Sequence, residues 1–335
     1  MRTASGWVLL VALGGLAACG SKGAGTSATG SAANGSRTAG QNAPGYNGNY
    51  NKPATAQEVA DESRGDVECP ARNKSAPRPS AVPVDDVVGV RPGMTYEEAT
   101  NFVLCTDKLL VAQLATDRGV NMQTYGQKIR QGFSARIAEA RVEKSSKQIM
   151  QEMQDDTFAR GSNRVVRDMK PGQSKWYVGT MGLPDHERVI TAAREEWFQE
   201  GHNPTAASVE QALVAKYGAP TKSQRNPGQT YLTWAYEPSG RPVAEGSPLF
   251  NQCAGTPDPN GGANYSPDCG LVIAARIASM PDNPDISQFI QVGVVDQAGG
   301  YRAITETEKG LANADEQRKA QQVQEAAKNA DAPKL

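Results

Sequence analysis

The sequence predicts an α+β fold in which helices pack on one side of an antiparallel sheet, giving two layers. Three segments of the second half alternate apolar and polar residues, which is typical of strands with one buried face. Other segments carry apolar residues at helical spacing, and one ends firmly at glycine and proline. Residues 20–58 and 306–335 are poor in large apolar side chains that could be buried. We therefore expect disordered N- and C-terminal tails, with a helical part before the sheet.

The composition excludes several classes of protein. The chain has 335 residues and a formal net charge of -1, so bulk charge gives no basis for binding nucleic acid. Only 38% of the residues are hydrophobic, while 34 are glycine and 21 are proline. A chain with so little apolar surface is not expected to be ordered throughout. It also lacks a run of roughly 18 apolar residues, so we expect no transmembrane helix.

Residues 1–18 have the organisation of a lipoprotein signal peptide. Arg2 gives a positive start, residues 7–13 are apolar, and the sequence LAAC occupies residues 16–19. This tetrapeptide resembles the lipobox of bacterial lipoproteins, in which the cysteine is lipidated and becomes the first residue of the mature chain. The resemblance implies a lipid such as palmitate on Cys19. The alternative is an ordinary secretory signal in which Cys19 occurs by chance.

The resemblance also implies a location. By similarity to Gram-negative lipoproteins, Gly20 after Cys19 favours the outer membrane. We therefore expect a protein of the cell envelope, anchored to the membrane through the lipid on Cys19 and facing the periplasm. Two or more acyl chains would make that attachment stable.

The remaining chain divides into four predicted segments. They are a flexible Gly/Ala/Ser tether at 19–58, a mostly helical segment at 59–170, an α+β domain at 171–305 and a polar mobile tail at 306–335. In the helical segment, Thr95 and Glu98 form a capping box that predicts a helix beginning there. Residues 127–160 are also predicted to be helical, because Ile129, Phe133 and Ile137 lie four residues apart.

Strand and helix signals alternate within the α+β segment. Residues 175–181 predict a strand, and 187–198 are ambiguous between a helix and a hairpin strand. A helix opens at Asn203-Pro204 or later at Ser208, and it stops at Gly218. Three further strands are predicted at 231–237, 271–279 and 288–296.

This order of elements resembles a known module. The helix that ends in Gly218-Ala219-Pro220 and the strands after it are similar to SmpA/OmlA-type assembly lipoproteins and to the β-lactamase-inhibitor-protein fold. The resemblance covers roughly 90 residues, and the long loop 238–269 departs from it. It implies a helix packed on an antiparallel sheet in a non-enzymatic module that holds or positions another protein.

Four cysteines besides Cys19 indicate disulfides, since an exported chain meets an oxidising compartment. Three pairings are open. We favour Cys253 with Cys269, because the stretch between them has almost nothing to bury and a covalent bond would order it, leaving Cys69 with Cys105. The alternative for Cys105 is a free thiol on a buried helix face. The only large apolar side chains of the loop 238–269 are those of Leu249, Phe250 and Tyr265. We expect them either to pin the loop to the sheet or to face a partner.

Signals for catalysis are weak. His186 and His202 lack further ligands at metal-binding spacing, and no nucleophile elbow or phosphate-binding loop is present. Oxygen ligands in one loop do not follow the EF-hand spacing that calcium would favour: Asp258, Asn260, Asn264 and Asp268. We therefore expect no metal, no cofactor and no enzyme, but a binding or assembly module for another envelope component. The alternatives are an inhibitor or immunity-type module against an exported enzyme, and a hydrolase with an unrecognised site.

Overall fold

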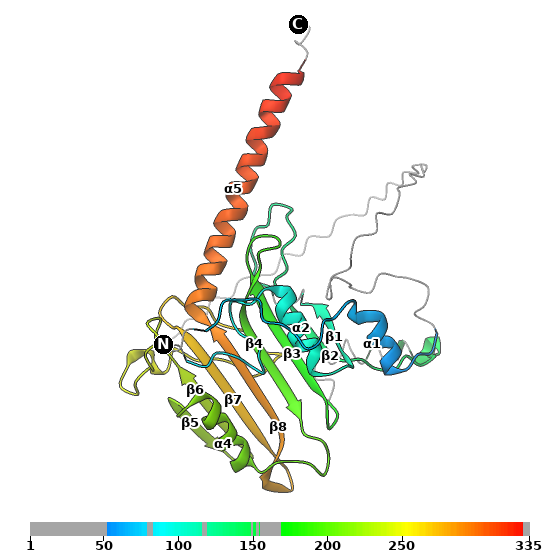
Figure 1. Cartoon of the computed structure of the whole chain (residues 1–335), viewed down its shortest axis with the longest axis vertical. Coiled ribbons are helices and arrows are strands. Elements are labelled where there is room, and N and C mark those ends of the chain that lie inside the picture. The colour runs from blue at the N-terminus through cyan, green and yellow to red at the C-terminus, as the bar shows by residue number, and fades with distance from the viewer. Residues whose placement is uncertain are drawn as a thin grey trace, which may run out of the picture. The chain divides into compact units, whose positions relative to one another are not determined.

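The computed structural model describes residues 52–78, 83–115, 119–148, 150, 151, 154 and 169–330. The predicted signal peptide, Cys19 and nearly all of the predicted tether lie outside these residues. The centre of the structure is an eight-stranded antiparallel sheet in the order β1-β2-β3-β4-β8-β7-β6-β5 (Figure 1). Its strands are β1 (Leu110–Leu114), β2 (Gly132–Ile137), β3 (Ser174–Met181), β4 (Arg188–Trp197), β5 (Lys222–Asn226), β6 (Gln229–Ala235), β7 (Leu271–Met280) and β8 (Asn283–Asp296).

The sheet consists of two halves with the same plan. In each half a helix precedes four strands that pair in chain order: α2 (Tyr96–Thr106) before β1–β4, and α4 (Ala206–Tyr217) before β5–β8. Both helices begin after a threonine N-cap, Thr95 or Thr205, whose hydroxyl accepts a backbone N–H three residues on. Each threonine also forms a bridge to the last strand of its own half, at Arg188 and at Ile286.

Strand irregularities repeat as well. The pairing of β3 with β4 shifts register between Gly179 and Thr180, and that of β7 with β8 shifts between Ala278 and Ser279. The two halves meet where β4 pairs with β8, over seven residues from Thr191 to Trp197. The fold is therefore a duplicated unit of one helix and four strands, joined into one sheet by its last strands.

Helices α2 and α4 cover the same face of the sheet. Alternate strand residues point into this layer, including the fully buried Trp176 and Trp234, and they form one core with Val103 and Leu213 of the helices. Ring contacts link the layers, since Tyr96 meets Phe133 edge-on at 5.4 Å between centroids. The prediction of helices packed on an antiparallel sheet is confirmed.

The long loop 238–269 crosses the opposite face of the sheet. A disulfide joins Cys253 to Cys269, and a small core forms around it with Val272 and Val295 of the sheet. Leu249, Phe250 and Tyr265 pack against this core, so they pin the loop to the sheet. A second disulfide joins Cys69 to Cys105 and ties the segment before the sheet to α2. These are the two pairs that the sequence favours.

The prediction of a mostly helical segment at 59–170 is wrong for much of its described part. It contains strands β1 and β2, besides α2 and part of α1 (Ala56–Arg64). The four-residue spacing of Phe133 and Ile137 predicts a helix, but an even spacing also places two residues on one face of a strand, as it does in β2. The ambiguous residues 187–198 are strand β4 for nearly their whole length.

The described part of the predicted C-terminal tail is helical. Helix α5 (Gln297–Asn329) begins after Asp296, whose carboxylate accepts the N–H of Gly299 at 2.8 Å. Thr307, Leu311 and Asp315 lie four residues apart on one face of it and are buried, and Arg318 and Lys319 form ion pairs with Asp315. The prediction missed this face because it contains a single large aliphatic residue.

Replacing that aliphatic residue should therefore destabilise the protein. We expect Leu311→Ala to lower the free energy of unfolding by about 2–4 kcal/mol, because Leu311 is fully buried. Val323→Ala is the matched control: Val323 lies on the same helix but is 69% exposed, so its loss should cost less than about 0.5 kcal/mol. Urea denaturation measures both. Equal stabilities of the two variants would show that α5 does not depend on this contact.

Candidate binding groove

A groove of about 360 Å³ lies on the helix-covered face, beside α4. Its floor is the junction of the two halves, where Ile290 and Val292 of β8 lie next to Arg194 of β4. Val209 and Leu213 of α4 line one wall, and Val87 and Val88 line another. The junction strands thus leave part of their apolar surface uncovered in the groove.

The turn that carries Val88 is strained. Val87 and Val90 exchange two backbone hydrogen bonds of 2.8 and 3.0 Å, which closes a turn with Val88 and Gly89 at its centre. Both central residues have positive φ angles, 46° and 86°, as in a type I′ turn. Asparagine or glycine suits the first of these positions, whereas a β-branched residue there is an outlier. Val88 is nevertheless 46% exposed, so burial does not compensate for the strain.

Glycine is required at the second position of the turn. Besides the φ of 86°, a Cβ on Gly89 would lie 3.0 Å from the Phe102 ring of α2. The turn is thus fitted closely against α2, while Val88 stays at the rim of the groove.

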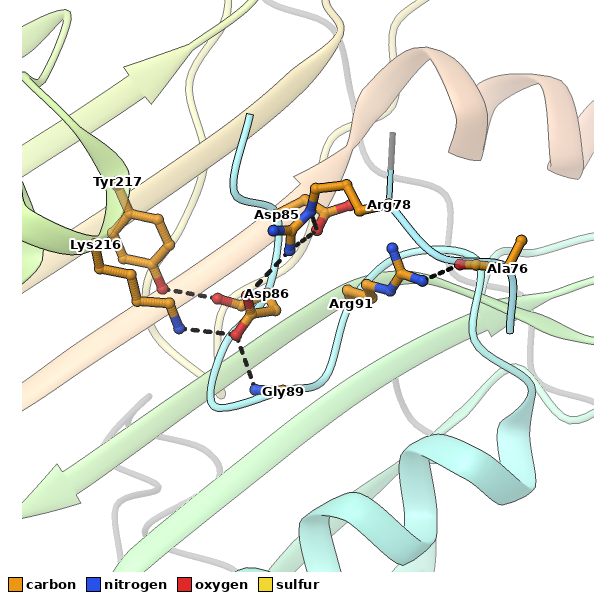
Figure 2. A network of polar contacts seen from close by, with 8 residues as sticks. All are labelled: Ala76, Arg78, Asp85, Asp86, Gly89, Arg91, Lys216 and Tyr217. Carbon is orange, nitrogen blue, oxygen red and sulfur yellow. Dashed lines mark hydrogen bonds and ion pairs between the residues drawn. The ribbon is translucent and has the colours of Figure 1, made fainter. Parts of the chain in front are cut away.

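A network of charged groups holds the turn against α4 (Figure 2). The Asp86 carboxylate accepts hydrogen bonds from Lys216 Nζ at 2.8 Å, from the Gly89 N–H at 2.9 Å and from Arg78 at 3.1 Å. The Tyr217 hydroxyl donates to the Asp86 carbonyl at 2.8 Å. Arg78 also pairs with Asp85, so both carboxylates of this segment are neutralised.

These contacts shift the acidities of the groups involved. Burial alone would raise the pKa of Asp86, but the bonds from Lys216, Gly89 and Arg78 outweigh it and lower that pKa. Burial raises the pKa of Tyr217, so its hydroxyl stays protonated and donates to Asp86. The network is therefore built to hold a carboxylate in its charged form.

Each charged side chain that lines the groove has a partner of opposite charge. Arg194 forms an ion pair with Glu196 at 2.5 Å, and its guanidinium lies 5.5 Å from the Trp176 ring centroid. Lys216 pairs with Asp86, as described above. The Ser208 hydroxyl donates to the Thr205 carbonyl at 2.9 Å. Because the charges are balanced and the other lining residues are largely apolar, the groove can bury an apolar surface of another molecule. Its described lining contains neither histidine nor cysteine.

The residues singled out from the sequence lie elsewhere. Both disulfides are outside the groove, and His186 and His202 are exposed. Asp258 accepts from the N–H of Asn260, and the described residues hold no group of three acidic, His or Cys side chains that could bind a metal ion. No motif in the sequence marks Asp86, Val88 or Lys216 as members of a site. The sequence offers a single indication of this site, which is a valine, Val88, directly before the glycine of a tight turn.

Comparison with family models, with curated proteins and with solved structures finds no match to this chain. Among the helices that the structure describes, none is long and apolar enough to cross a membrane.

The Asp86 network should make stability depend on pH. Because the folded pKa of Asp86 is lowered from 3.8, its stabilisation is complete above that value and is lost as pH falls through the lowered pKa. We expect Asp86→Asn to lower the free energy of unfolding by about 1–3 kcal/mol at neutral pH, and by little once wild-type Asp86 is protonated. Urea denaturation of both proteins across this pH range measures the difference. Asp285→Asn, at the exposed start of β8, is the control; a difference that does not shrink in acid would contradict the charge argument.

Proposed function

We propose that this protein is a lipid-anchored module of the cell envelope that binds another protein, and that the groove beside α4 receives an apolar segment of that partner. The lipobox at residues 16–19 supports the anchor, and two disulfides fit an oxidising compartment. The order of elements from Val209 to Asp296, which resembles that of assembly lipoproteins, implies the same class of function.

The proposal rests on the backbone strain and the exposure of Val88. A β-branched residue with positive φ costs roughly 1–2 kcal/mol, and here it also exposes apolar surface to water. Backbone strain of this kind concentrates at functional sites, where the strained residue contacts a ligand or a partner. The groove next to Val88 has the apolar centre and polar rim of a protein interface.

A protein segment fits this groove better than a charged small molecule. Arg194 and Lys216, the two cationic side chains that line the groove, each have an acidic partner. The buried Nε of Arg194 lacks a hydrogen-bond partner among the described residues, but the charge of its guanidinium is balanced by Glu196. The floor and walls offer apolar side chains from three separate elements, enough for a few apolar side chains of a partner to insert.

Blocking the groove tests the proposal. Ala212 is exposed and lines the groove, while the neighbouring Gln211 is exposed but does not line it. A photo-crosslinking residue at position 212 of the full chain in intact envelopes should give a defined adduct with a partner, and one at position 211 should not. With the purified partner, Ala212→Arg should weaken binding about tenfold or more, and Gln211→Arg less than about twofold. Equal effects at the two positions would exclude the groove as the docking site.

Relieving the strain should separate stability from binding. Val88→Asn places a residue that tolerates positive φ in the turn, so we expect the free energy of unfolding to rise by about 1 kcal/mol and Tm by about 2–4 °C. Affinity for the partner should fall, because an apolar contact is removed. Thermal melts and a binding titration measure the two effects. A variant that is more stable and binds equally well would remove Val88 from the interface.

A further inference from the structure

The face of the sheet opposite the groove carries a row of polar side chains. Lys175, Glu195, Gln291, Arg276 and Tyr231 are direct neighbours on five adjacent strands, from β3 to β6. Because they occupy matching positions in the register, their side chains project on one face. Glu195 is only 4% exposed and Gln291 only 3%.

Glu195 organises the centre of this row. One of its oxygens accepts from Trp197 Nε1 at 2.7 Å. The other accepts from Gln291 Nε2 at 2.7 Å and from Lys175 Nζ at 3.0 Å. Since the amide nitrogen of Gln291 is fixed by Glu195, its amide oxygen is directed toward Arg276. A buried carboxylate with these three donors therefore has little capacity left to neutralise Arg276.

Arg276 is held in place but its hydrogen-bonding capacity is largely unused. Its guanidinium lies 5.2 Å from the Phe289 ring centroid and 5.9 Å from that of Tyr231. Nη1 reaches Gln291 at the long distance of 3.4 Å, and the buried Nε has no hydrogen-bond partner within the described residues. A guanidinium has five N–H donors arranged to bind a carboxylate through two parallel hydrogen bonds.

We propose that Arg276 anchors a carboxylate of an acidic protein segment, which makes this face a second docking surface, independent of the groove. The charges favour such a partner. Three basic side chains lie along the row, those of Arg136, Lys175 and Arg276, whereas the acidic side chain among them is that of Glu195. Phe289 stacks on Trp197 with 5.1 Å between ring centroids, so rigid aromatic side chains flank the guanidinium. Arginine and aromatic residues together are typical of the energetic centre of an interface.

An acidic peptide is the probe for this surface. We expect N-acetyl-tetraglutamate amide, titrated into the disulfide-bonded protein, to shift the NMR signals of the Arg276 Nε–H and the Trp197 indole N–H in a saturable way. The uncharged tetraglutamine peptide should not shift them. Arg276→Gln should weaken peptide binding about tenfold or more, and Arg276→Lys by less, since lysine keeps the charge but not the paired donors. Arg302→Gln, at an exposed arginine of α5, should leave binding unchanged.

Several outcomes would overturn the proposal. The first is that the acidic peptide causes no saturable shift in the wild-type protein, and the second is that tetraglutamine causes equal shifts. The third is that an Arg276→Gln variant shown by thermal melt to be folded binds the peptide normally. Inorganic phosphate that shifts these signals more strongly than the peptide would identify a phosphate site instead. Because the wild-type titration needs no variant, the proposal can fail even if Arg276→Gln does not fold. Groove-blocking Ala212→Arg should not affect this titration, so the two proposals can fail separately.

Discussion

The antiparallel pairing of β4 with β8 is the interaction on which the rest of the structure depends. It joins two units of one helix and four strands into one sheet, with Arg194 opposite Val292 and Glu195 opposite Gln291. Since successive side chains of a strand point to opposite faces, these two neighbouring pairs serve different surfaces. Arg194 and Val292 lie in the groove, while Glu195 and Gln291 lie in the polar row.

The two faces of the junction differ in chemistry because they are covered differently. On the helix side, α4 and the turn 87–90 border a groove over the junction, and apolar strand residues remain half-buried there. On the other side, the disulfide-bonded loop covers β7 and β8 at Gly293, where a Cβ would meet the Thr256 carbonyl at 2.3 Å. The polar row crosses β7 and β8 next to the part that this loop covers. The two proposed docking surfaces, one apolar and one basic, would therefore receive different partner surfaces.

In the proposed function, the turn 87–90 gives up stability for binding. The Asp86 network ties the turn that carries the strained Val88 to Lys216 and Tyr217 of α4. Charged groups held by several hydrogen bonds give a fixed geometry, whereas an isolated surface ion pair contributes little. The groove wall therefore depends on ionised groups, although the groove itself is apolar.

The sequence alone determined the elements whose signals are local. The alternation in β6, β7 and β8, the capping box of α2 and the stop at Gly218 each lie within a few residues, so the sequence predicts them. The stretch between Cys253 and Cys269 likewise indicated its own bond. Tertiary structure decided the rest. Strand β5 has five exposed polar residues, and its backbone pairs with β6. The groove and the polar row unite residues from distant segments, because the junction of β4 with β8 brings them together and no local pattern encodes that pairing.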